Sequence, residues 1–240
     1  MHSAAKPCTA DHKEAFMGLF DKAMQGASAA GAQAGAGAGE LLAQWKADRV
    51  ITLSSEPESL EQLKAAVDVT DPGSVAAYWV YAVTCLTADY EIGMSMMKYL
   101  FADIEPFGRG FTEGGVSGKA GWDSYMNERL KSDDYRWLPR AYFVGAAASN
   151  GFNPTRPLSV ALSFNAPNTE TVNAQSVKQL GRLNIVYYVT SNAAGNKVNL
   201  TLSKFDGSDR WYVTNGTASS GLFYDQRAGL TAEAKAKLYN

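Results

Sequence analysis

The spacing of apolar residues changes at residue 157, and this change constrains the fold of the 240-residue chain more than any other feature. In residues 74–86, "SVAAYWVYAVTCL", apolar side chains recur three and four positions apart, which is the spacing of one helix face. In residues 157–164, "PLSVALSF", they alternate with polar or small residues, as in a strand with one buried face. We therefore expect an α+β protein, in which an N-terminal helical layer packs on a C-terminal antiparallel β-sheet or small barrel.

Helix-start signals divide the first half of the chain. Ser55 and Glu58 have the spacing of a capping box, which predicts that a helix begins there. The Asp71–Pro72 step predicts a second helix start and Asp89 a third. Because the break between these last two helices is short, we expect them to form an αα-hairpin. Residues 121–131, "GWDSYMNERLK", predict one further helix.

Strand patterns occur on both sides of the helical region. A short strand is expected at residues 50–53, "VITL". Polar and Gly-containing loops at 191–196 and 206–209 are typical of hairpin connections between later strands. Those later strands are expected at 182–189, 197–203 and 210–214.

The N-terminal 39 residues differ in composition from the rest of the chain. They combine a Gly/Ala-rich stretch at 26–39, typical of a flexible linker, with a short apolar helix stripe formed by Phe16, Phe20 and Met24. A helix of about two turns is too short to be stable alone. We therefore expect it to contact an unknown protein partner or a membrane surface, or to fold back on its own chain. Either Met1 or Met17 could be the native start.

The remainder, residues 40–240, is interpreted as a single α+β domain that is mainly helical over 40–145 and antiparallel β over 157–225. A net charge of -2, with Lys and Arg scattered, disfavours nucleic-acid binding. No window reaches the ~18 apolar residues of a membrane span, and the polar N-terminus does not resemble a signal peptide. A cytoplasmic location is therefore expected, with no transmembrane segment.

Most catalytic groups are scarce in the chain. His2 and His12 lie in the N-terminal tail, and Cys85 sits within an apolar helix pattern, where a small core residue is the expected role. The Gly-rich stretch at 110–121 lacks the spacing of a phosphate-binding loop. We expect no metal site and no cofactor. Carboxylates are the remaining catalytic candidates, and a paired-carboxylate hydrolase stays open.

The segment "LPRAYFVGAAASNGFNPTRP", residues 138–157, which we call the seam segment, joins the helical and β regions. Its motif is similar to that of an uncharacterised bacterial family of domains of unknown function, and the resemblance covers roughly residues 60–225. The family has no established activity, so the resemblance implies no catalytic residues. The matching residues are Tyr142, Phe143, Gly145, Ala146, Asn150, Gly151, Phe152, Pro154 and Pro157.

Two interpretations of the seam segment differ in kind. It could be a structural joint, with a turn at Asn150–Gly151. It could also line a shallow ligand pocket with Tyr142, Phe152 and Arg156, together with the carboxylate of Asp134. The sequence favours a non-enzymatic binding or scaffold protein. The alternative is a small-ligand binder or carboxylate-dependent hydrolase that uses the seam segment, and a deep, partly apolar pocket against Arg156 would favour it.

Overall fold

The computed structural model describes residues 42–101, 135, 137–192 and 197–214, without the side chains of residues 175–180. The chain divides into two units, residues 1–44 and 45–240, and the second contains all of the helices and strands named below. The domain boundary expected near residue 40 lies outside the described residues and stays a prediction. The helix expected at 121–131 also lies outside them, as does the Gly-rich stretch at 110–121.

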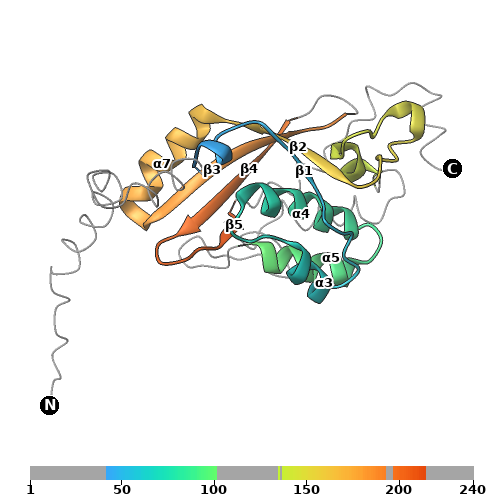
Figure 1. The fold of residues 1–240 in the computed structure, drawn as a ribbon, viewed down its shortest axis with the longest axis horizontal. Coiled ribbons are helices and arrows are strands. Elements are labelled where there is room, and N and C mark those ends of the chain that lie inside the picture. The colour runs from blue at the N-terminus through green and yellow to red at the C-terminus, as the bar shows by residue number, and fades with distance from the viewer. Residues whose placement is uncertain (1–41, 102–134, 136, 193–196, 215–240) are drawn as a thin grey trace, which may run out of the picture. The chain divides into compact units, whose positions relative to one another are not determined.

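Five strands form one antiparallel sheet in the order β1-β2-β3-β4-β5 (Figure 1). Each strand pairs with the next one along the chain, so the described strands form a meander that curls into a half-barrel. The strands predicted from alternation are confirmed, including the short first strand. Their bounds are Arg49–Thr52 (β1), Ser159–Phe164 (β2), Arg182–Thr190 (β3), Lys197–Phe205 (β4) and Trp211–Val213 (β5).

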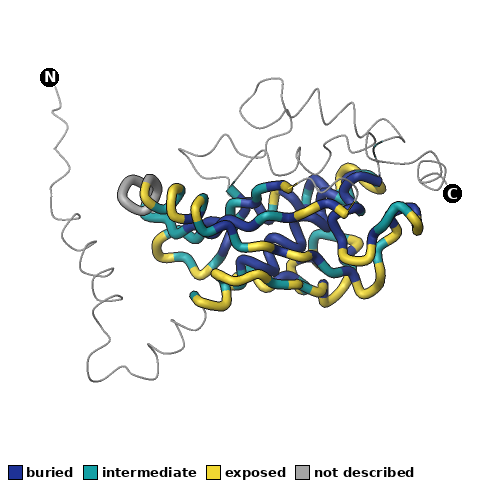
Figure 2. The backbone as a smooth tube through the Cα atoms, turned by 90° about the horizontal axis from the view of Figure 1, so that it is seen from above, coloured by how far each residue is buried: buried dark blue, intermediate teal, exposed yellow. Residues whose placement is uncertain are grey.

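Helix α4 (Pro72–Cys85) lies at the centre of the unit, and its residues from Pro72 to Val83 are all buried. It packs against the sheet on one side and against α5 (Tyr90–Leu100) on the other. Helix α3 (Leu60–Ala66) also contacts α5. Figure 1 shows these helices together on one side of the sheet, and Figure 2 shows the buried residues gathered in the interior of the described part. The predicted α+β architecture is confirmed.

The start of α4 is fixed as its sequence predicts. The Asp71 carboxylate accepts hydrogen bonds from the backbone N–H groups of Gly73 and Ser74, both at 3.2 Å. The same carboxylate receives two hydrogen bonds from the Arg49 guanidinium of β1, at 2.6 and 2.9 Å. One side chain therefore caps the helix and ties it to the first strand.

Helices α4 and α5 form the predicted αα-hairpin, with Asp89 as the N-cap of α5. The two helices meet at Gly93. A Cβ atom at this position would lie 2.4 Å from the backbone nitrogen of Leu86 and 2.8 Å from its Cα. Because backbone atoms cannot move aside as a flexible side chain can, this close approach requires glycine.

The predicted start of α3 is wrong by four residues. Ser59, not Ser55, is the N-cap, and its hydroxyl accepts a hydrogen bond from the Gln62 N–H at 3.3 Å. The Gln62 side chain in turn accepts from the Glu58 N–H at 2.8 Å. Two consecutive segments have the Ser-x-x-Glu/Gln spacing, and a helix start at the second places Leu63 in the core.

Helix α7 (Ala166–Leu180) was not predicted, and it interrupts the β half between β2 and β3. It lies on the face of β3 opposite α4. On β3, Ile185 and Tyr187 belong to the main core, whereas the alternate residues Asn184 and Val186 bond to α7. The Asn173 side chain exchanges hydrogen bonds with the Asn184 backbone at 2.7 and 2.9 Å. Polar contacts therefore hold this helix to the sheet.

Candidate functional site

The seam segment begins with a 3₁₀ helix, η2 (Leu138–Tyr142), and a second one, η3 (Ala148–Asn150), follows. Between them Phe143 pairs with Val160 of β2 in an isolated β-bridge. The Asn150 side chain organises the loop, since its amide donates to the carbonyls of Gly145 and Asn153 at 2.9 and 2.8 Å and its oxygen accepts from the Ala147 N–H at 2.9 Å. The predicted turn at Asn150–Gly151 is confirmed, because Gly151 has a φ of 65°.

Two further features fix the seam segment in place. Gly145 has a φ of 80°, and a Cβ atom there would lie 2.2 Å from the Thr155 hydroxyl, so the close return of the loop requires glycine. The turn after β3 holds the segment from the other side. Asn192 donates from its backbone N–H to the Ala141 carbonyl at 2.9 Å and from its side chain to the Phe143 carbonyl at 2.7 Å.

The residues predicted to form a contact site differ in whether they are buried or exposed. Tyr142 and Phe152 are 1% and 0% exposed, and the Phe152 ring stacks on Trp137 with centroids 4.6 Å apart. Arg156 instead lies at the surface, where it forms an ion pair with Glu56. Asp134 lies outside the described residues, as do Phe16, Phe20 and Met24. Of the three described candidates, Arg156 lines a pocket that contains neither Tyr142 nor Phe152.

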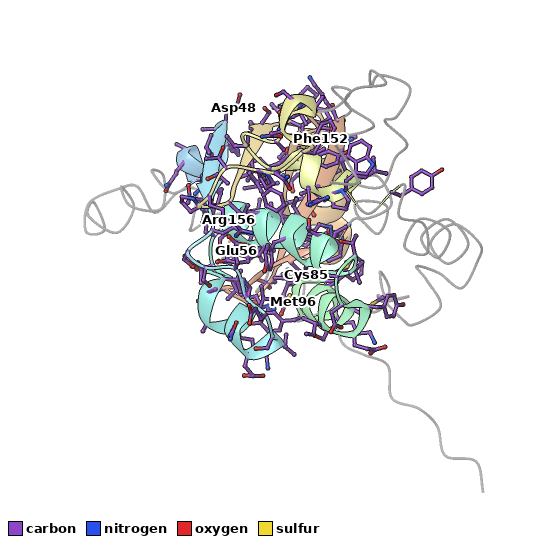
Figure 3. All side chains as sticks on the ribbon, turned by 90° about the vertical axis from the view of Figure 1, so that its right-hand side faces the viewer. Asp48, Glu56, Cys85, Met96, Phe152 and Arg156 are labelled. Carbon is purple, nitrogen blue, oxygen red and sulfur yellow. The ribbon has the colours of Figure 1, made fainter. Side chains whose placement is uncertain are left out.

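That pocket has a volume of about 430 Å³ and opens to solvent. It lies between the C-terminal end of α4 and the seam segment, with Glu56 contributed by the chain before α3. Figure 3 shows Arg156 and Glu56 next to each other, near Cys85 at the end of α4. From α4 and the turn after it come Tyr81, Thr84, Cys85, Thr87 and Ala88. From the seam segment and the strand start come Arg140, Phe143, Asn153, Pro154, Arg156 and Leu158.

The described lining of the pocket carries more positive than negative charge. Glu56 and Arg156 neutralise each other as an ion pair. Arg140 is half-buried, and burial lowers its pKa from the ordinary value. Its guanidinium donates to the Asn153 side-chain oxygen at 3.4 Å, and no carboxylate of the described residues lies within ion-pair distance of it. The described lining therefore holds one excess positive charge.

The hydroxyl groups of the lining already donate their protons to backbone carbonyls. Tyr81 donates to Pro57 at 3.1 Å, Thr84 to Val80 at 3.0 Å and Thr87 to Thr84 at 2.7 Å. Their oxygens can therefore only accept further hydrogen bonds. Burial raises the pKa of the Cys85 thiol to about 11, so it is protonated and a poor nucleophile at neutral pH.

A family model described as Domain of unknown function (DUF6935) matches residues 55–228 of the chain. The chain belongs to this family. The resemblance to an uncharacterised domain family is thereby confirmed, and every described lining residue of the pocket falls within the matched range. No curated protein matches the chain, and no solved structure matches it.

Two exclusions hold for the described part of the family domain and its flanks. Across residues 42–101, 135, 137–192 and 197–214, no three His, Cys, Asp or Glu side chains are grouped so that they could hold a metal ion. In the same ranges, no helix has the length and apolar character needed to cross a membrane.

Sequence reasoning missed the larger part of this pocket. Arg140 stands in the seam segment, but nothing in its spacing distinguishes it from a surface arginine. Glu56 is distant in sequence and is brought to the pocket by the fold. The signal that could have been used is the polar end of α4, where Thr84 and Thr87 follow a long apolar stretch.

Proposed function

We propose that this domain is a non-enzymatic module that binds a small organic ligand in the pocket between α4 and the seam segment. The observation that carries the proposal is the pocket against Arg156, whose volume of about 430 Å³ is in the range of small-molecule sites. Its lining combines apolar surface from Ala88 and Pro154 with a few charged and polar groups. That combination is typical of ligand sites in which apolar contacts provide affinity and polar groups fix the orientation of the ligand.

Binding is better supported than catalysis. A hydrolase of the paired-carboxylate type needs two carboxyl groups facing one bond. In the described lining Glu56 is the one carboxylate, and it is engaged by Arg156. Burial also raises the pKa of Tyr81, so this residue, like Cys85, stays protonated at neutral pH. The second carboxylate of a hydrolase would have to come from a residue such as Asp134, outside the described part.

A scaffold role for the N-terminal segment is a separate proposal. The apolar stripe of Phe16, Phe20 and Met24 lies outside the matched range of the family, and it would add a protein or membrane contact to the ligand-binding body. We also propose that the protein is bacterial and works in the cytoplasm. The free thiol of Cys85 is in keeping with a reducing compartment.

The pocket can be tested by filling it. Ala88 is exposed and lines the pocket, so Ala88→Trp should occupy the cavity without disturbing the core. Ala65→Trp, at an exposed position on α3 that does not line the pocket, is the matched control. Ligand-observed NMR with a library of small aromatic fragments should show binding to the wild type and to Ala65→Trp but not to Ala88→Trp. Equal binding to all three proteins would contradict the proposal.

A further inference from the structure

The half-buried guanidinium of Arg140 points to the chemistry of the ligand. Arg140 lies in η2, between buried Pro139 and Ala141, which hold its backbone in place. A guanidinium has five N–H donors. In the described residues its one polar contact is the neutral amide oxygen of Asn153, at the long distance of 3.4 Å. Arg140 therefore lines the pocket with most of its hydrogen-bonding capacity unused.

Two other described arginines, Arg156 in the pocket and Arg49 beside the start of α4, show the contrast. Arg156 pairs with Glu56, and Arg49 makes a two-bond contact with Asp71. Both cations are thus compensated by a carboxylate of the protein. Arg140 is not compensated by any described carboxylate, so a ligand anion would supply the missing partner.

The part of the pocket lining that comes from α4 and the turn after it has the reverse preference. Thr84 and Thr87 have already donated their protons and can only accept. They lie in the last turn of α4 and just after it, where the partial negative charge of a helix C-terminus favours cations and hydrogen-bond donors. A ligand that spans the pocket therefore needs an anion at one end and a donor at the other.

We infer that the pocket binds a small amino or hydroxy acid, with its carboxylate on Arg140 and its ammonium or hydroxyl group toward Thr84 and Thr87. A single carboxylate matches the one excess positive charge of the described lining better than a phosphate dianion does. Ala88, which is exposed, and Pro154, which is partly exposed, provide apolar contact for the side chain of the ligand. This inference rests on the proposed ligand-binding function and specifies the chemical class of the ligand.

The experiment compares five probes that share a phenyl group. They are phenylalanine, 3-phenylpropionate, 2-phenylethylamine, 2-phenylethanol and phenyl phosphate. Dissociation constants are measured by NMR titration for the full-length wild type, Arg140→Gln, Arg140→Lys and Lys98→Gln. Lys98 is exposed and does not line the pocket, so Lys98→Gln removes the same charge elsewhere. Melting curves confirm that each variant is folded.

Phenylalanine should bind most tightly. Arg140→Gln should weaken the binding of phenylalanine and of 3-phenylpropionate by about tenfold or more. This is the size of effect expected for a charge-assisted hydrogen bond. Arg140→Lys should retain part of this affinity, and Lys98→Gln should retain all of it. Equal affinity for 3-phenylpropionate and 2-phenylethanol, or tightest binding of phenyl phosphate, would overturn the inference while leaving a ligand pocket. If none of the probes binds, the proposed function itself is overturned.

Discussion

Arg156 of the seam segment forms an ion pair with Glu56, which lies before α3, and both side chains line the pocket. Both side chains are partly open to solvent, with 69% of Arg156 and 30% of Glu56 exposed. Exposed pairs of this kind contribute about 0–1 kcal/mol to folding. The pair therefore bears on the charge of the pocket more than on stability.

Neutralising Glu56 should strengthen anion binding. With Glu56→Gln the described lining changes from two arginines and one glutamate to two unopposed arginines. We expect 3-phenylpropionate to bind several-fold more tightly, with the free energy of unfolding changed by less than about 1 kcal/mol. Glu61→Gln, at an exposed position on α3, is the control and should change neither quantity. Weaker anion binding by Glu56→Gln would show that the carboxylate itself contacts the ligand.

Gly93→Ala should destabilise the αα-hairpin. The added methyl group would meet the backbone of Leu86 at 2.4 Å, so α5 must move away from α4. The expected loss is about 3 kcal/mol, as for overpacked cores that cannot relax. Urea unfolding measures it, with Glu91→Ala at an exposed α5 position as the reference. A loss no larger than that of Glu91→Ala would mean that the two helices are less closely packed than the structure shows.

Asn150→Ala should loosen the loop that carries Asn153 and Arg156. The variant removes three hydrogen bonds to the backbone of the seam segment. We expect the free energy of unfolding to fall by about 1–3 kcal/mol, together with weaker binding of pocket ligands. Ser149→Ala, at the exposed neighbouring position, should leave both unchanged. Unaltered stability in Asn150→Ala would contradict the role given to this amide.

The reactivity of Cys85 should continue to increase with pH up to about 11. Burial raises the pKa of its thiol from the ordinary 9.0 to about 11, so the folded protein keeps a proton that the unfolded chain has released. Folding stability contributed by this group is full below pH 9 and is lost as pH rises toward 11. Initial rates of alkylation by iodoacetamide in a Cys8→Ser chain would test this. A plateau already near pH 9 would contradict the burial of the thiol.

Removing residues 1–39 tests the separate proposal for the N-terminal segment. If Phe16, Phe20 and Met24 contact an external partner, the melting temperature of the 40–240 chain should equal that of the full-length protein. If the segment instead folds back on its own chain, its apolar side chains stabilise the body, and removing them should lower the melting temperature. A clear drop would therefore exclude the partner proposal.

The architecture was predictable where apolar periodicity is strong. The strands and the α4–α5 hairpin follow from alternating and three-to-four spacing, and Asp71 and Asp89 cap the helices as expected. Helix α7 was missed because its sequence has no long apolar stripe, and the described side chains that bond it to β3 are the polar Asn173 and Thr169. Its sequence signals were the Asn165 cap before Pro167 and the glycine at 181 that ends it.

The pocket was less predictable than the fold. Aromatic residues of the seam segment can point to the core or to solvent, and sequence alone could not show that both Tyr142 and Phe152 are buried while Arg156 lines the cavity. The pairing of Glu56 with Arg156 depends on the approach of two segments far apart in the chain. Arg140 becomes notable only because, among the described residues, no carboxylate lies within ion-pair distance of it.

Protection of Cys85 from alkylation is the most direct test of the central claim that the pocket binds a small ligand. Cys85 lines the cavity, so a bound ligand must restrict access to its thiol. In a Cys8→Ser chain, phenylalanine at a concentration that saturates its NMR signal change should slow alkylation by iodoacetamide at pH 9, and Ala88→Trp should abolish this dependence. An alkylation rate that does not change while phenylalanine is bound would place the ligand elsewhere and contradict the claim.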